Sequence, residues 1–177
     1  MLQFQSPLKV KFICGFIFKD NTVYIKALAV LEKKFGAIDV ESAAIDFNFT
    51  DYYEKEMGKD LIRRFISFKK LQDPGAFIKI KHFCVKLERK FAVGNLRRIN
   101  IDPGYLNEAK LVLTTTKDFS HRIYLGSGVF AEITLNYHAK GFHDHSTTFP
   151  DYRTDKYKNI FLEIREIYRT QISDAKK

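Results

Sequence analysis

The sequence predicts a single α+β domain whose core is a ferredoxin-like, duplicated β-α-β unit. The motif LEKKF at residues 31–35 recurs as LERKF at residues 87–91, an offset of 56 residues. Apolar residues surround both copies at helical spacing, and alternating apolar residues flank them as in strands. We therefore expect a duplicated core over residues 1–102, a β-meander with a loop over 103–153 and a terminal helix over 154–177.

Each copy is predicted to form a strand, a helix and a strand, at residues 8–18, 21–35 and 38–49 and then at 61–72, 75–91 and 96–102. At the offset of 56, the helical positions Tyr24, Leu28, Leu31 and Phe35 match Ile80, Cys84, Leu87 and Phe91, while Val10 and Phe12 match Ile66 and Phe68. Asp20 and Asp73 stand where helix N-caps are expected, and Gly36 can end the first helix. Since each half has one apolar helix stripe and one apolar sheet face, both helices should cover the same side of a shared sheet.

The second half of the chain has a different pattern. Strands are predicted at 110–117, 121–126 and 129–137, the last two joined across Gly126-Ser127-Gly128, which is typical of a meander. A polar loop should follow over 138–153. The final helix, about 154–172, carries one apolar face that includes Tyr157, Phe161 and Tyr168, and it can pack on the sheet or on a second subunit.

Composition limits the cellular setting and the partners. The formal net charge of +9 favours anionic partners, although the basic residues form scattered doublets that a solvated surface also explains. Cys14 and Cys84 lie in apolar stretches without metal-ligand spacing, so we expect core thiols. No secretory signal or membrane span is recognisable, and we expect a cytoplasmic protein with no membrane partner.

The first candidate cluster is the segment between the two halves, residues 49–58, with adjacent Tyr52 and Tyr53 among three acids. Such a composition can line a pocket. A capped helical turn whose tyrosine rings close the edge of the core explains the same residues.

The second candidate cluster is Asp102-Pro103-Gly104-Tyr105, followed by Lys110. Asp-Pro-Gly is typical of a turn, because Pro fixes φ and Gly accepts a positive φ. A turn is the default interpretation, and a carboxylate at the end of a strand beside a tyrosine and a lysine is also compatible with a polar cluster at the mouth of a cleft.

The third candidate cluster is residues 114–122, the densest group of hydroxyl, basic and acidic side chains. Lys117 and Arg122 could neutralise a phosphate, and His121 could act as a general acid or base. A hairpin turn with solvated charges gives the same composition. A hairpin centred on Ser127 places Glu132 opposite Arg122 and within reach of His121.

The sequence indicates no metal site and no identifiable cofactor. His143 and His145, two residues apart on a loop, lack the fixed spacing of a helical zinc motif. Neither GxxxxGK[ST] nor GxGxxG occurs, which excludes the two common Gly-rich nucleotide-binding loops.

Four segments carry a resemblance to an uncharacterised prokaryotic family, domain of unknown function 4416. They are residues 49–58 (FTDYYEKEMG), 102–106 (DPGYL), 115–125 (TTKDFSHRIYL) and 149–153 (FPDYR). The resemblance covers nearly the whole chain. It implies a prokaryotic, cytoplasmic setting and supplies no mechanism.

Three functions are compatible with these residues. The leading hypothesis is binding of a phosphate-bearing ligand, a nucleotide or RNA, by Lys110, Lys117, His121 and Arg122, with Tyr52, Tyr53 or Tyr105 stacking on a base. The second is a small hydrolase or transferase in which Asp102 and His121 transfer protons while Lys117 and Arg122 stabilise negative charge. The third is an oligomeric structural protein that associates through the terminal helix.

Overall fold

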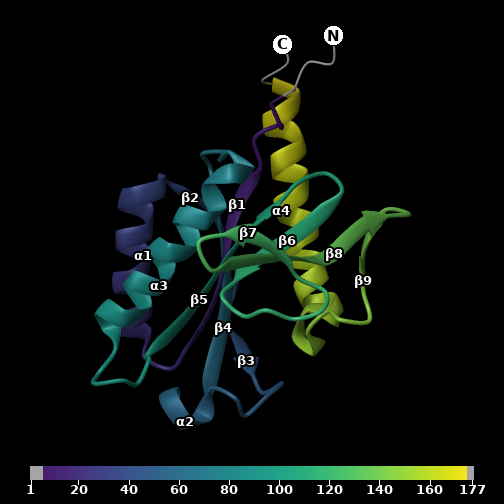
Figure 1. Cartoon of the computed structure of the whole chain (residues 1–177). Coiled ribbons are helices and arrows are strands. Elements are labelled where there is room, and N and C mark those ends of the chain that lie inside the picture. The colour runs from purple at the N-terminus through teal and green to yellow at the C-terminus, as the bar shows by residue number, and fades with distance from the viewer. Residues whose placement is uncertain (1–5, 175–177) are drawn as a thin grey trace.

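A computed structural model describes residues 6–174, whose strands form one antiparallel sheet of nine strands. The hydrogen-bonded order is β2-β4-β1-β5-β6-β8-β7, with β3 beside β4 and β9 beside β8. The strands are β1 (Lys11–Phe18), β2 (Ile38–Glu41), β3 (Ile45–Phe47), β4 (Leu61–Phe68), β5 (Ile99–Leu106), β6 (Lys110–Thr115), β7 (Ile123–Gly126), β8 (Val129–His138) and β9 (Gly141–Asp144). Figure 1 shows helices α1 (Asn21–Phe35) and α3 (Phe77–Phe91) on one side of this sheet and α4 (Asp155–Asp174) on the other. The α+β class is therefore confirmed.

Local signals determine where the first helices begin. The Asp20 side chain accepts a hydrogen bond from the Thr22 N–H at 2.8 Å, and α1 ends at Gly36, whose φ of +99° suits glycine. Asp73 accepts from the Gly75 N–H at 2.6 Å and opens the short 3-10 helix η1 (Pro74–Ala76), which leads directly into α3. The predicted helices at 21–35 and 75–91 are confirmed.

Both helices of the repeated motif contribute to one hydrophobic core with β1, β4 and β5. Tyr24 and Leu31 of α1 are buried there, as are the matching Ile80 and Leu87 of α3. The helices also begin 56 residues apart, at Asn21 and Phe77. The expectation that both helices cover the same side of a shared sheet agrees with the structure.

The offset of 56 does not extend to the strands. Strands β1 and β4 begin at Lys11 and Leu61, only 50 residues apart, because residues 69–76 connect β4 to α3 whereas residues 19–20 connect β1 to α1. The predicted match of Phe12 with Phe68 thus pairs the second residue of one strand with the last residue of another.

The opposite face of the sheet is covered by α4. Its apolar residues Tyr157, Phe161, Ile164 and Tyr168 are buried in a second core. The sheet supplies Ile13, Phe65 and Leu106, among others, to the same core. The predicted terminal helix is confirmed, and its aromatic face is used within the chain.

The predicted meander is wrong in its pairing. Strand β6 pairs with one edge of β8, and β7 pairs with the opposite edge. Residues 116–122 therefore connect β6 to β7 across the end of β8. Strand β8 has ten residues, which is long enough for β7 and β9 to share that outer edge. The predicted loop at 138–153 accordingly contains β9 and the 3-10 helix η2 (Pro150–Arg153).

The sheet opens between β5 and β6. Gly104, Tyr105 and Leu106 of β5 pair with Leu113, Val112 and Leu111 of β6, while the earlier part of β5 lies beside α3. There, Glu88 accepts the Ile101 N–H at 2.6 Å, and Lys81 Nζ donates to the Ile101 carbonyl at 3.3 Å. Two buried side chains of α3 therefore bond the peptide groups that a neighbouring strand would otherwise bond.

Candidate functional site

Two neighbouring cavities lie at the end of the molecule that carries the short helix α2 (Glu54–Met57), at the bottom of Figure 1. The aromatic pocket has a volume of about 550 Å³, and the polar cavity about 510 Å³. The polar cavity is lined by Tyr52, Tyr53, Glu56, Lys81, Val85, Glu88, Arg89, Ala92, Gly94, Asn95, Arg97, Asn100, Asp102, Thr116 and Lys117. Aromatic rings and charged groups dominate the aromatic pocket, which is lined by Phe47, Phe49, Thr50, Tyr52, Tyr53, Arg63, Asp102, Leu113, Lys117, Phe119, Arg122, Phe149, Pro150, Asp151 and Tyr152. Both volumes are in the range of small-molecule sites.

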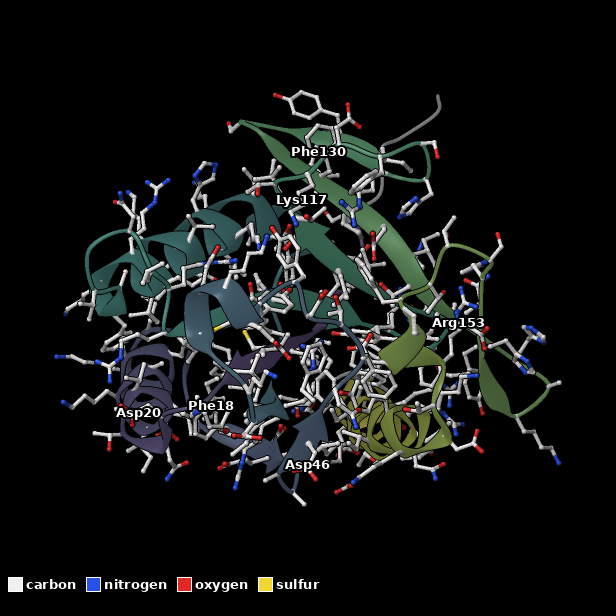
Figure 2. The ribbon with its side chains drawn as sticks, turned by 90° about the horizontal axis from the view of Figure 1, so that it is seen from below. Phe18, Asp20, Asp46, Lys117, Phe130 and Arg153 are labelled. Atoms are coloured by element: carbon white, nitrogen blue, oxygen red, sulfur yellow. The ribbon has the colours of Figure 1, made fainter. Side chains whose placement is uncertain are left out.

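The aromatic pocket gathers all four segments on which the family resemblance rests. Residues 49–58 contribute Tyr52 and Tyr53, residues 102–106 contribute Asp102, residues 115–125 contribute Lys117, and residues 149–153 contribute Asp151. Figure 2 looks at this end of the molecule and shows Lys117 in the upper part of the view, between the teal helix α3 and the green strands around β8. Segments far apart in sequence therefore build one site.

Arg63 forms the buried floor of the pocket. It lies on β4 between the buried residues Leu61 and Phe65 of the same strand face, and only 3% of it is exposed. Its Nη2 donates to Asp151 Oδ2 at 2.6 Å, and its Nη1 lies 3.7 Å from Asp102 Oδ2. The rings of Phe47, Phe65, Tyr152 and Tyr157 surround its guanidinium carbon at 5.1 to 5.9 Å.

Several buried polar atoms at this floor have no hydrogen-bond partner among residues 6–174. They are Nε and Nη1 of Arg63 and the hydroxyl groups of Tyr152 and Tyr157. A Cβ on Gly15 would lie 3.1 Å from Arg63 Nη1 and 3.2 Å from the Tyr152 hydroxyl, so the glycine leaves room for both groups. Buried donors without partners are costly, and an acceptor atom of a ligand would relieve that cost.

Both tyrosine hydroxyls stay protonated at neutral pH. Burial raises the pKa of Tyr152 well above its usual value of 10, although Arg63 acts in the opposite direction. Burial likewise raises the pKa of Tyr157 to about 12. Of the two, Tyr152 lines the pocket, whose floor therefore presents a neutral hydroxyl donor beside the guanidinium group of Arg63.

Asp102 stands in the wall that the two cavities share. Asn100 Nδ2 donates to its Oδ2 at 2.7 Å, and Lys81 Nζ lies 3.8 Å from its Oδ1. With Arg63 on the other side, the carboxylate is held from three directions. It can accept hydrogen bonds from a ligand in either cavity.

Lys117 and Tyr52 form the exposed rim. Lys117 Nζ donates to the Tyr52 hydroxyl at 2.9 Å and lies 4.1 Å from the centroid of its ring. Tyr53 stands beside Tyr52 with its ring nearly perpendicular, and burial raises its pKa, as does Asp102 to a smaller extent. The predicted Tyr52, Tyr53 and Lys117 thus lie together.

The predicted pairing of Glu132 with Arg122 is confirmed. Arg122 Nε donates to Glu132 Oε2 at 2.7 Å, and His121 Nε2 lies 3.1 Å from the same oxygen. Arg122 Nη1 also donates to the Lys117 carbonyl at 3.0 Å. Since Glu132 already neutralises Arg122, this arginine holds the 116–122 segment in place rather than offering a free charge to a phosphate.

The structure places Tyr105, Lys110 and His121 in a different cavity, together with Glu132. Tyr105 is three residues from Asp102 on β5 and so faces the other side of the sheet, where its ring packs against Phe77. The predicted cluster of Asp102, Tyr105 and Lys110 is therefore not formed. Asp102 and His121, the proposed acid–base pair, line separate cavities.

The histidine-rich segment forms β9 and its flanks. The His138 and His143 rings stack with centroids 3.7 Å apart, and His143 Nε2 lies 3.1 Å from the His138 carbonyl oxygen. Within the part of the chain that the structure describes, no group of three or more His, Cys, Asp or Glu side chains is placed to hold a metal ion.

Sequence reasoning missed the residues at the centre of the site. Arg63 and Arg64 form one of the scattered basic doublets that a solvated surface explains, yet the position of Arg63 between Leu61 and Phe65 on the apolar face of a strand indicates burial. Lys81 and Glu88 follow the apolar stripe of α3 by one residue each and are also buried. No local pattern reveals that Asp151 would pair with Arg63, 88 residues earlier.

Each helix within residues 6–174 is too short or too polar to cross a lipid bilayer. No curated protein and no solved structure matches the chain. A family model described as "Domain of unknown function (DUF4416)" matches residues 8–168, which include all four segments of the aromatic pocket. The chain belongs to the DUF4416 family.

Proposed function

We propose that the aromatic pocket binds a small ligand that combines a planar ring with a phosphate group, as nucleotides do. The observation that carries this proposal is the convergence of four distant segments around buried Arg63, whose Nε and Nη1 make no hydrogen bond within residues 6–174. The aromatic walls suit stacking on a planar ring. Lys117 at the rim and the donors at the floor suit an anionic group.

The anion contacts differ from those that the sequence suggested. Arg122 is neutralised by Glu132, and Lys110 and His121 line another cavity, which leaves Lys117 as the accessible cation of the original set. Arg63 adds a cation from the floor. It is already paired with Asp151, so it is suited to orient a ligand acceptor through its remaining N–H groups.

A small ligand suits this pocket better than an RNA strand. In RNA-binding sheets of the RRM type, bases stack on an open sheet face. Here α4 covers the face formed by β1 and β4, where Ile13 and Phe65 are buried against Phe161. The aromatic rings available for stacking instead line the aromatic pocket.

The test is a binding titration with a nucleoside, its 5′-monophosphate, inorganic phosphate and a labelled single-stranded RNA at low salt. We expect the monophosphate to bind more tightly than either the nucleoside or phosphate alone. Lys117→Gln should weaken that binding about tenfold, as expected for a charge-assisted contact. Lys26→Gln, which removes an exposed lysine from α1, is the matched control.

Two results would contradict the proposal. The first is no detectable binding of any nucleotide or nucleoside at low salt. The second is equal affinity of the Lys117→Gln and Lys26→Gln variants for the monophosphate. Circular dichroism of each variant verifies that the fold is retained, which is expected because both lysines are exposed.

The proposal also includes the finer description of the fold and its setting. Residues 11–106 are proposed to be a ferredoxin-like duplication, supported by two 15-residue helices that pack on one face of the sheet. A prokaryotic cytoplasm is the proposed location. The family resemblance supports it, as do the buried free thiols of Cys14 and Cys84, which suit a reducing compartment.

A further inference from the structure

The polar cavity adjoins the aromatic pocket along a shared wall. Tyr52, Tyr53, Asp102 and Lys117 line both. A ligand in the aromatic pocket would therefore be separated from the polar cavity by these shared residues alone. One face of α3 lines another part of the polar cavity through Lys81, Val85, Glu88 and Arg89, and residues 92–100 line much of the rest.

The acids of the polar cavity are already bonded. Glu56 accepts from Arg97 Nε at 2.5 Å, and Glu88 accepts the Ile101 N–H at 2.6 Å. Asp102 accepts from Asn100 and lies between Arg63 and Lys81. Each carboxylate thus has donors of its own, which reduces its repulsion of an incoming anion.

Two cations of this cavity have no acidic partner among the described residues. Arg89 and Lys117 are exposed, and neither forms an ion pair within residues 6–174. Lys81 is buried, and its Nζ makes one hydrogen bond, a long one of 3.3 Å, although an ammonium group has three donors. Lys81, Arg89 and Lys117 therefore line one cavity and have N–H groups that are free to donate hydrogen bonds to a ligand.

We infer that the ligand is a nucleoside di- or triphosphate whose base lies in the aromatic pocket and whose phosphate chain extends into the polar cavity toward Lys81 and Arg89. This inference rests on the proposed function. The shared wall places Lys117 where it can contact the first phosphate, and Arg89 stands beyond it on α3. A single phosphate would leave the cations of α3 unused.

The inference is tested by comparing a nucleoside 5′-monophosphate with the corresponding diphosphate and triphosphate. We expect affinity to rise at least tenfold from monophosphate to triphosphate. Arg89→Gln should remove most of that gain, about tenfold for the triphosphate, and leave monophosphate binding unchanged. Lys90→Gln, which removes the neighbouring exposed cation of α3 outside the cavity, should change neither.

The outcomes separate this inference from the proposed function. If the monophosphate binds through Lys117 but the triphosphate binds no tighter, or if Arg89→Gln matches Lys90→Gln, the inference is wrong and the proposed function stands. If no nucleotide binds, both are wrong. A single-stranded RNA that binds more tightly than the triphosphate would overturn the assignment to a free nucleotide.

Discussion

Glu88 is a buried carboxyl group on α3, where this helix packs beside β5. Its Oε1 accepts the Ile101 N–H at 2.6 Å, and only 6% of the residue is exposed. Burial raises its pKa from the ordinary 4.5 to about 7, while Lys81 and the Ile101 N–H act in the opposite direction. The charge state of this group therefore changes near neutral pH.

Glu88→Gln should alter how stability depends on pH. Below pH 4.5 the carboxyl is protonated in the folded and the unfolded chain, whereas between pH 4.5 and 7 only the folded chain holds the proton. The wild type should therefore lose about 3 kcal/mol of unfolding free energy as pH rises through this window, and the variant should not. Urea denaturation of both proteins from pH 4.5 to 8 measures the difference, and parallel curves would refute the assignment.

Gly15 provides the space that Arg63 and Tyr152 occupy at the floor of the pocket. In Gly15→Ala the new Cβ would lie 3.0 Å from Phe65 Cε1 and 3.1 Å from Arg63 Nη1. We expect a loss of about 1–3 kcal/mol in stability from this overpacking, with weaker ligand binding. Gly141→Ala is the control, because its Cβ would meet only His143 Nε2, at 3.8 Å. Equal denaturation midpoints for the two variants would show that Gly15 is not constrained.

At the scale of elements, the helices could be predicted and the strand partners could not. Caps such as Asp20 and the apolar stripe around Leu31 are local signals, and the structure places α1 at the predicted residues. Pairing depends on residues distant in sequence. The alternation of apolar and polar residues in β8 is compatible with pairing to β6 or to β7. The register of β6 on β8 is set by the core in which Leu111 and its partner Leu135 are both buried.

The β7–β8 hairpin depends on the ion pair between Arg122 and Glu132. Only 3% and 4% of the two side chains are exposed, so Glu132→Ala would leave a buried guanidinium without its main partner. We expect a loss of about 3–5 kcal/mol, measured by chemical denaturation. The double variant Arg122→Met/Glu132→Leu should be less destabilised than Glu132→Ala, because no unpaired charge remains. The opposite order would show that the pair is not the reason for the loss.

At the scale of the whole molecule, the candidate site depends on the order of strands in the sheet. Arg63 on β4, Gly15 on β1 and Asp102 on β5 belong to three adjacent strands, and η2 brings Asp151 onto them. Composition pointed to aromatic and basic residues, and four residues that line the aromatic pocket, Tyr52, Tyr53, Asp102 and Lys117, were candidates from the sequence. Their convergence could not be, since it requires the register of β1 with both β4 and β5.

The two hydrophobic cores share one sheet, and β1 contributes to both. Phe12 and Cys14 face α1 and α3, whereas Ile13 between them faces α4. A strand buried on both faces should couple the cores, so the chain is expected to unfold as one cooperative unit.

Leu31→Ala in the first core and Phe161→Ala in the second test this coupling. Each should destabilise by about 2–5 kcal/mol. Because both cores lose their packing when β1 leaves the sheet, each variant should lower a single transition that far- and near-ultraviolet circular dichroism report at the same urea concentration. If Phe161→Ala instead separated the two signals and left the α1–α3 core folded, residues 11–106 would be an autonomous unit, and the aromatic pocket would lie at a boundary between domains.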